Sequence, residues 1–100
     1  MDRQKVAEVF SPGEFLREEI EARGWTQRDL AKVLGRPLQT VNQIINGKKR
    51  ITPETAVELS AALGTSPDLW LNLENDYRLA QITRVDPRIA RRAKQLAKAG

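Results

Sequence analysis

Three amide side chains gather near the middle of the chain, at Gln39, Asn42 and Gln43. The amides of Gln and Asn can pair with N6 and N7 of adenine through two hydrogen bonds, which discriminates between bases by roughly 1–3 kcal/mol each. Thr40 can hydrogen-bond to a base edge as well. Leu38 either packs against a thymine methyl group or is simply an exposed apolar residue on a turn. These five residues are the candidate DNA base contacts.

Polar and basic residues on both sides of this segment could meet a phosphate backbone. Gln27 stands where a helix is expected to begin, so its amide and the unpaired N–H groups of the helix end could hold a phosphate. After the segment, an Asn-Gly pair leads into three basic residues, a pattern that also describes an ordinary solvated turn. The full set of candidate phosphate contacts is Thr26, Gln27, Arg28, Arg36, Asn46, Lys48, Lys49 and Arg50.

Several kinds of chemistry are excluded by residues that the sequence lacks. The 100 residues include no cysteine and no histidine, which removes the thiol nucleophile, the most common general base and the most common transition-metal ligands. We therefore expect neither enzymatic activity nor a metal or cofactor. No apolar run is long enough for a secretory signal or a membrane span, so the sequence predicts a cytoplasmic protein with no membrane partner.

Charge is divided unevenly along the chain. Residues 36–52 hold four basic and no acidic side chains, and residues 53–77 hold five acidic and no basic ones. Residues 78–100 are again basic, with seven basic side chains and one acidic side chain. One surface could thus meet phosphates while another meets a different partner, although ordinary solvated faces would give the same blocks.

Helix start and stop signals divide the chain into short helices. Ser, Thr or Asp caps followed by proline or an acidic residue predict helix starts near residues 12, 26, 53, 67 and 87. Glycines predict helix ends near residues 24, 35 and 64. A further helix follows Pro37 and ends near residue 46. The last helix has only two large apolar residues, Ile89 and Leu96, so it cannot bury enough surface to be stable alone.

The second and third helices must position the amide residues. A tight, glycine-containing turn between two short helices sets the second of them out from the body at a steep angle. Because Val41, Ile44 and Ile45 are expected to face the core, the amides face outward, where the helix can enter the major groove. The sequence predicts an all-α protein with an arm over residues 1–10, a five-helix domain over 11–82 with its helix-turn-helix at 26–46, and a short basic C-terminal helical extension over 83–100.

The fifth helix is apolar on more than one side, which implies a second contact besides the core. We consider four of its residues as contacts to a second copy or another partner: Trp70, Leu71, Leu73 and Tyr77. Burial of Trp70 in the core is the alternative. Five acidic residues would meet a basic partner or would simply face solvent away from DNA: Glu54, Glu58, Asp68, Glu74 and Asp76.

Two groups of motifs resemble known DNA-binding proteins. Residues 26–31 (TQRDLA), 34–35 (LG) and 40–48 (TVNQIINGK) resemble the lambdoid phage repressor type of helix-turn-helix, the XRE family, and this likeness covers residues 11–64. Residues 12–14 (PGE) and 62–73 (ALGTSPDLWLNL) resemble, more narrowly, the HigA-type antitoxins of toxin-antitoxin modules. The resemblance implies a lambda-repressor-like fold.

The same resemblance implies a function and partners. It implies a homodimer that represses its own operon by binding double-stranded DNA at a palindromic operator in its own promoter. It also implies that a separate surface holds a small basic RelE-like toxin of the HigB type, an mRNA-cleaving ribonuclease, in an inactive state.

The sequence departs from the family pattern in two places. The family usually has Ser or Thr before the recognition helix, whereas this chain has Pro37, so we expect that helix to lack a side-chain cap and to begin one residue later. The basic tail also continues past the usual end of the short antitoxins. It is either a DNA-contacting extension or a sign that the chain is the N-terminal part of a longer regulator.

Two other functions stay open on the sequence alone. One is a phage or chromosomal repressor without a toxin partner, which would keep every DNA contact. The other is a protein-interaction module that has lost DNA binding.

Overall fold

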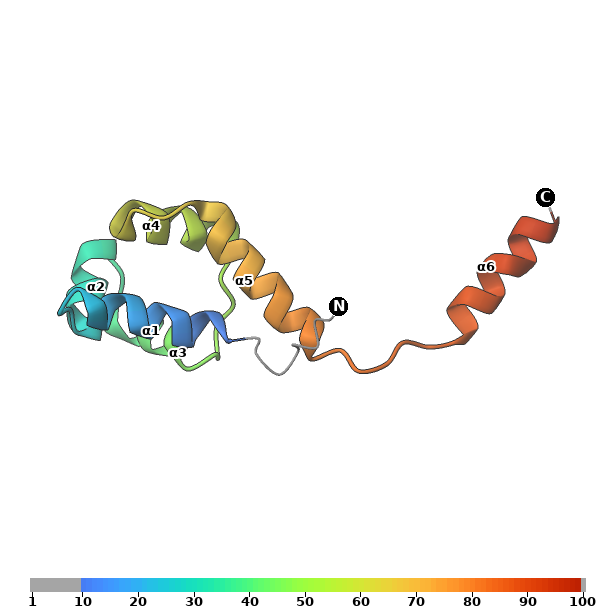
Figure 1. The fold of residues 1–100 in the computed structure, drawn as a ribbon, viewed down its shortest axis with the longest axis horizontal. Helices are drawn as coiled ribbons and strands as arrows, with labels where there is room; N and C mark the ends of the chain where they lie inside the picture. The colour runs from blue at the N-terminus through green and yellow to red at the C-terminus, as the bar shows by residue number, and fades with distance from the viewer. Residues whose placement is uncertain (1–9, 100) are drawn as a thin grey trace.

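The computed structural model describes residues 10–99, so most of the predicted arm over residues 1–10 lies outside the described part. Within that part there are six helices and no strand (Figure 1), which confirms the all-α prediction. In chain order the helices are α1 (Pro12–Ala22), α2 (Gln27–Leu34), α3 (Leu38–Ile45), α4 (Pro53–Leu63), α5 (Pro67–Ala80) and α6 (Arg88–Ala99). No helix of the described range combines the length and the apolar character needed to cross a membrane.

The helix boundaries follow the predicted caps. Ser11, Thr26, Thr52 and Ser66 each accept a hydrogen bond at the side-chain oxygen from the backbone N–H three residues further on, which satisfies a donor that the first helical turn leaves unpaired. α2 and α4 end at glycines in the left-handed conformation, as the sequence indicated. The helix starts and stops are thus local properties of the chain.

Helices α1 to α5 share one hydrophobic core. α2 packs on α3, α1 lies against α3 and α5, and α4 lies against α5 and α2 (Figure 1). Trp70 is fully buried, its ring meets that of Phe15 edge to face with centroids 5.4 Å apart, and its Nε1 donates to Thr65 Oγ1 at 2.7 Å. The buried apolar residues are Leu16, Ile20, Leu30, Ala31, Val41, Ile44, Ile45, Ile51, Ala56, Leu59, Leu63 and Trp70.

α6 lies away from this body. Figure 1 shows it at the far end of an extended segment that follows α5. Every residue from 87 to 97 is exposed, including the two large apolar residues Ile89 and Leu96. Residues 87–97 therefore contribute nothing to the core.

Candidate DNA interface

α3 is fixed to the body by its apolar side and by the turn that precedes it. Val41, Ile44 and Ile45 are buried, as predicted. In the turn, Gly35 adopts a left-handed conformation with φ 69°, and the N–H of Arg36 donates to the Ala31 carbonyl oxygen at 3.0 Å. The hydrogen bonds of this turn fix where α3 leaves α2, and the three buried side chains fix its rotation about its own axis.

The start of α3 differs from the prediction in one respect. No side chain caps its first turn, and the N-cap position is occupied by Pro37, as expected. The helix nevertheless begins directly after this proline, at Leu38, because a proline φ of −62° with an extended ψ is compatible with an N-cap. The expected delay of one residue is therefore absent.

The polar side of α3 faces solvent. Gln39 is exposed, and Thr40, Asn42 and Gln43 are partly exposed. Within residues 10–99, none of these four side chains forms a hydrogen bond to another protein group. Leu38 is half-buried and packs against the core, so it is not simply an exposed residue on a turn. The outward orientation of the amides is as predicted, and their contact with bases stays a prediction.

The turn after α3 presents three basic residues. The carbonyl oxygen of Gln43 accepts hydrogen bonds from the N–H groups of Lys48 and Lys49, at 2.8 and 3.2 Å. Lys48, Lys49, Arg50 and the preceding Asn46 are all exposed, and no acidic side chain of the described part pairs with the three cations. The structure thus brings the predicted phosphate contacts of this turn beside the end of α3.

The start of α2 is a capping box. Thr26 Oγ1 accepts from the N–H of Asp29 at 3.0 Å, and Asp29 Oδ2 accepts from the N–H of Thr26 at 2.8 Å. The backbone hydrogen bond from Thr26, supported by its side-chain hydrogen bond, lowers the pKa of the exposed Asp29 carboxyl. Gln27 follows in the first turn, and its Oε1 is buried with no hydrogen-bond partner among residues 10–99. Arg28 is exposed.

Arg36 is engaged inside the protein. Its guanidinium forms two hydrogen bonds to Glu58, with Nη2 to Oε2 at 2.6 Å and Nε to Oε1 at 3.1 Å, and Nη2 also lies 3.5 Å from Glu54. These carboxylates raise the pKa of Arg36. The predicted phosphate contact of Arg36 would compete with this ion pair. The geometry instead supports a brace between the helix-turn-helix and α4.

The five acidic residues of the segment 53–77 do not form one solvated surface, because Glu74 is buried. Its side chain is 7 % exposed, its Oε1 accepts from the N–H of Ile51 at 3.2 Å, and its Oε2 pairs with Arg78 Nε. Ile51 follows the basic turn directly, so this carboxylate ties the end of the turn to α5. The sequence could have indicated that Glu74 is buried, because position 74 lies one helical turn after the buried Trp70 on the same side of α5.

The structure also corrects the predicted partner contacts on α5, because these side chains are buried or half-buried. Trp70 is wholly within the core and is therefore inaccessible to a partner. Leu71 and Leu73 are half-buried against the core, and Tyr77 is half-buried beside the Arg78 guanidinium, which lies 5.4 Å from its ring centroid. The apolar breadth of α5 reflects contacts with both α1 and α4, which the helical period alone could not distinguish from an interface.

Gly13 lies against α3, a position that neither its place in the predicted helix start nor its place in the PGE motif indicated. A Cβ added at this position would lie 2.1 Å from the Ile45 carbonyl oxygen and 2.6 Å from that of Ile44. These are the last residues of α3, so the first turn of α1 touches the backbone of the recognition helix. The available signal was a glycine in the first turn of a predicted helix, where no left-handed conformation requires it.

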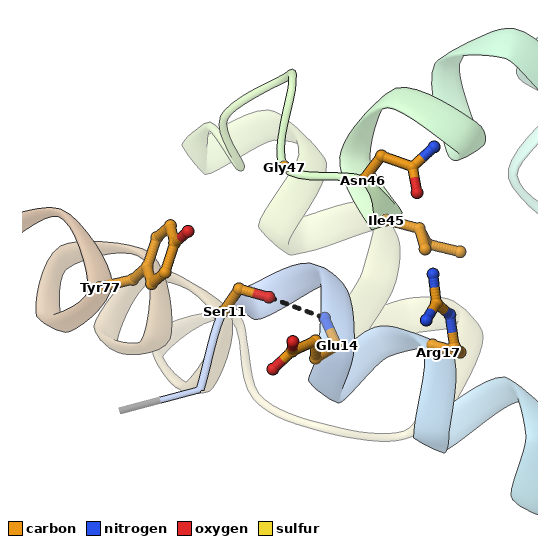
Figure 2. A pocket seen from close by; sticks show the side chains of 7 residues that line it. All are labelled: Ser11, Glu14, Arg17, Ile45, Asn46, Gly47 and Tyr77. Carbon is orange, nitrogen blue, oxygen red and sulfur yellow. Dashed lines mark hydrogen bonds between the residues drawn. The ribbon is translucent and has the colours of Figure 1, made fainter. Parts of the chain in front are cut away.

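A surface pocket of about 370 Å³ lies between the start of α1, the end of α3 and α5 (Figure 2). Its lining is Ser11, Glu14, Arg17, Ile45, Asn46, Gly47 and Tyr77. Tyr77 therefore lies beside the turn that carries the predicted phosphate contacts. Arg17, exposed on α1 beside Ile45 and Asn46, is a cation that the sequence analysis missed, because it stands among glutamates.

The comparisons with known proteins agree with this geometry. A helix-turn-helix family model matches residues 16–70. Antitoxin HigA-1 of Vibrio cholerae is 41 % identical over 74 residues, which cover 73 % of this chain and 70 % of that protein. An addiction module antidote protein of a HigA family from Coxiella burnetii has a similar structure, with a TM-score of 0.70, 33 % identity, and coverage of 90 % of this chain and 92 % of that one.

A third relative was solved with DNA. The Pseudomonas aeruginosa antitoxin HigA, in a structure with the higBA promoter, gives a TM-score of 0.70 at 30 % identity and covers 89 % of this chain and 91 % of that one. The chain belongs to the helix-turn-helix family of DNA-binding regulators and, within it, to the HigA-type antitoxins. This is a family of transcription regulators and not of enzymes, in agreement with the prediction from the missing cysteine and histidine.

Proposed function

We propose that this chain is a sequence-specific DNA-binding repressor that acts as the antitoxin of a HigBA-type module. It binds an operator in its own promoter and holds an mRNA-cleaving toxin inactive. The observation that carries the DNA-binding part is the polar side of α3. There Gln39, Asn42 and Gln43 face solvent and form no hydrogen bond to the rest of residues 10–99, while the opposite side of the helix is buried. The similar antitoxin solved with its promoter supports the same function.

The residues divide into two roles. Leu38, Gln39, Thr40, Asn42 and Gln43 contact base edges in the major groove. A second group contacts phosphates and so positions α3 without reading sequence: Thr26, Gln27, Arg28, Asn46, Lys48, Lys49 and Arg50. Arg36 is left out of this group because Glu58 already holds its guanidinium.

The chain acts as a homodimer on a palindromic operator. Two recognition helices related by a twofold axis would then lie one helical turn of DNA apart, about 34–36 Å. Light scattering of the purified chain would give the mass of a dimer, and footprinting would protect two half-sites at that spacing. A monomer that protects a single half-site would contradict this part of the proposal.

The base contacts are tested by gel shift on the promoter DNA and on random DNA. Gln39→Ala and Gln43→Ala should each weaken binding to the promoter by about 5- to 150-fold, equivalent to 1–3 kcal/mol, and should leave binding to random DNA nearly unchanged. The matched control is Lys48→Ala with Lys49→Ala, which should weaken both and reduce the salt dependence. Equal losses on both DNAs for the glutamine variants would refute the assignment.

The antitoxin part has its own test. In the cytoplasm, the toxin would be the basic product of the adjacent reading frame, and acidic residues that remain exposed, such as Asp68 and Asp76 on α5, suit a basic partner. Co-expression of the chain should rescue growth from that product, and a pulldown should recover both proteins. A repressor without a toxin partner would bind its operator and fail both assays.

A further inference from the structure

α6 is the most strongly charged element of the protein, and the proposed function does not use it. Its twelve residues include five basic and no acidic side chains. The helical period places Arg88, Arg91 and Arg92 on one side and the apolar Ile89 and Leu96 on another. A helix with this charge attracts polyanions such as nucleic acid.

One acidic residue near the helix neutralises only part of this charge. Asp86 accepts from the N–H of Arg88 at 2.9 Å, pairs with its Nε at 3.0 Å, and lies 3.9 Å from Arg92 Nη2. Arg91 and Lys94 are exposed and have no acidic partner within the described residues. The helix therefore has uncompensated positive charge on its surface.

An apolar partner is a poorer fit. Ile89 and Leu96 are the only large apolar side chains of α6, and they are 52 % and 76 % exposed. Two such residues offer little area to bury, and an isolated helix of twelve residues is marginal in water. A second copy of α6 would bring like charges together, which opposes self-association.

The position of the end of α5, from which the segment leading to α6 departs, indicates which polyanion α6 can reach. Tyr77, in the last turn of α5, lines the pocket that also contains Asn46 and Gly47 (Figure 2). α5 thus ends close to the turn that carries the proposed phosphate contacts. Residues 81–87 separate α5 from α6 and can span up to about 24 Å when extended, so α6 can reach phosphates next to those bound by this turn.

We infer that α6 binds DNA phosphates that flank the half-site read by α3. The inference rests on the proposed DNA-binding function and extends it to a second contact region outside the helix-turn-helix. The basic side of the helix meets the backbone without reading bases, so it adds affinity and salt dependence and leaves sequence preference unchanged.

The test uses the full chain and two duplexes of the promoter. One duplex contains the footprinted operator alone, and the other continues for about one helical turn of DNA, roughly 10 bp, on each side. The charge variant combines Arg91→Gln with Lys94→Gln. The matched control combines Ile89→Gln with Leu96→Gln, which changes two side chains of the same helix without changing charge. Affinity is measured over a salt series, and circular dichroism confirms that each variant folds.

The expected result is a change in the salt dependence on the long duplex only. The slope of log affinity against log salt should become less steep by about 0.9 for each phosphate contact that the complex loses, so by about 2 for each protomer and by about 4 for a dimer of the charge variant. The apolar control should keep the slope of the unmodified chain, and all three proteins should bind the short duplex alike. Preference for promoter over random DNA should not change.

Several outcomes would overturn the inference. Equal slopes for the charge variant and the unmodified chain on the long duplex would do so, and so would an equal decrease in the apolar control. A charge variant that no longer recovers the adjacent-frame protein in a pulldown, with its DNA slope intact, would assign α6 to a protein partner. If the unmodified chain binds neither duplex better than random DNA, the proposed function fails and this inference fails with it.

Discussion

α3 and α5 both have polar residues beside a buried apolar side, but the two helices use these polar residues in opposite ways. On α3 the amides of Gln39, Asn42 and Gln43 are exposed or partly exposed and form no hydrogen bond to another group of residues 10–99. On α5 the carboxylate of Glu74 is buried and satisfied by Ile51 and Arg78. Polar groups that a fold leaves unpaired on a rigid surface are available to a ligand, whereas those that it pairs internally hold the fold together.

Internally paired residues and unpaired surface residues should therefore affect different measured properties when they are mutated. Changes on α5 should lower stability, and changes on the outer side of α3 should lower DNA binding at nearly constant stability.

Trp70→Ala should have the largest effect. The indole is fully buried and its Nε1 is hydrogen-bonded to Thr65, so its removal should lower the free energy of unfolding by about 3–5 kcal/mol. Urea denaturation followed by circular dichroism measures this change. Trp25→Ala is the control, because that indole is only partly buried and should cost less. A folded, stable Trp70→Ala chain that has merely become monomeric would place this residue at an interface.

Glu74→Ala should have an intermediate effect. It leaves the Ile51 N–H and the Arg78 guanidinium without their acceptor, which should lower the free energy of unfolding by about 1–3 kcal/mol. Glu74→Gln keeps a carbonyl oxygen for Ile51 and should cost less. Asp76→Ala, which removes an exposed carboxylate from the same helix, should change stability by less than about 0.5 kcal/mol. Equal effects at positions 74 and 76 would contradict the role assigned to Glu74.

The smallest effect concerns the cap of α2. The pKa of Asp29 is lowered in the folded state, first by the backbone hydrogen bond from Thr26 and then by that residue's side chain. Its contribution to stability is therefore present above the ordinary pKa of 3.8 and is lost as the pH falls through the lower folded value. Denaturation at several pH values should show that the stability difference between the unmodified chain and Asp29→Asn narrows below about pH 4.

Asp86 provides the control for this pH dependence. The pKa of its carboxyl is also lowered, by the side-chain and backbone hydrogen bonds from Arg88, but it lies in the segment between α5 and α6. Asp86→Asn should leave the unfolding of the α1 to α5 body unchanged at every pH. A stability difference for Asp29→Asn that stays constant from about pH 6 to about pH 3 would show that the carboxylate contributes nothing to the cap.

Much of the fold could be predicted from the sequence because the signals are local. The caps at Ser11, Thr26, Thr52 and Ser66 and the buried side of α3 lie within one or two helical turns of the residues that they organise. Ile51 is a buried residue that no helical period marks, because it lies between α3 and α4.

The candidate site could be predicted only in part. The outward residues of α3 followed from the helical period, but the Arg36 brace to Glu58 joins residues 22 positions apart, and no local pattern indicates such a pair. No local pattern indicates the role of Gly13 either. A Cβ at this position would collide with the carbonyl oxygen of Ile45, which belongs to another helix.

The sequence by itself determined where the helices begin and end and which side of α3 is polar, since capping and the helical period act between near neighbours. The tertiary structure alone decided which charges and aromatic rings are used internally. Burial and ion pairing depend on residues that only the packing of distant helices brings together. This is why Glu74 and Trp70 are buried in the body of the protein and why Arg36 pairs with Glu58.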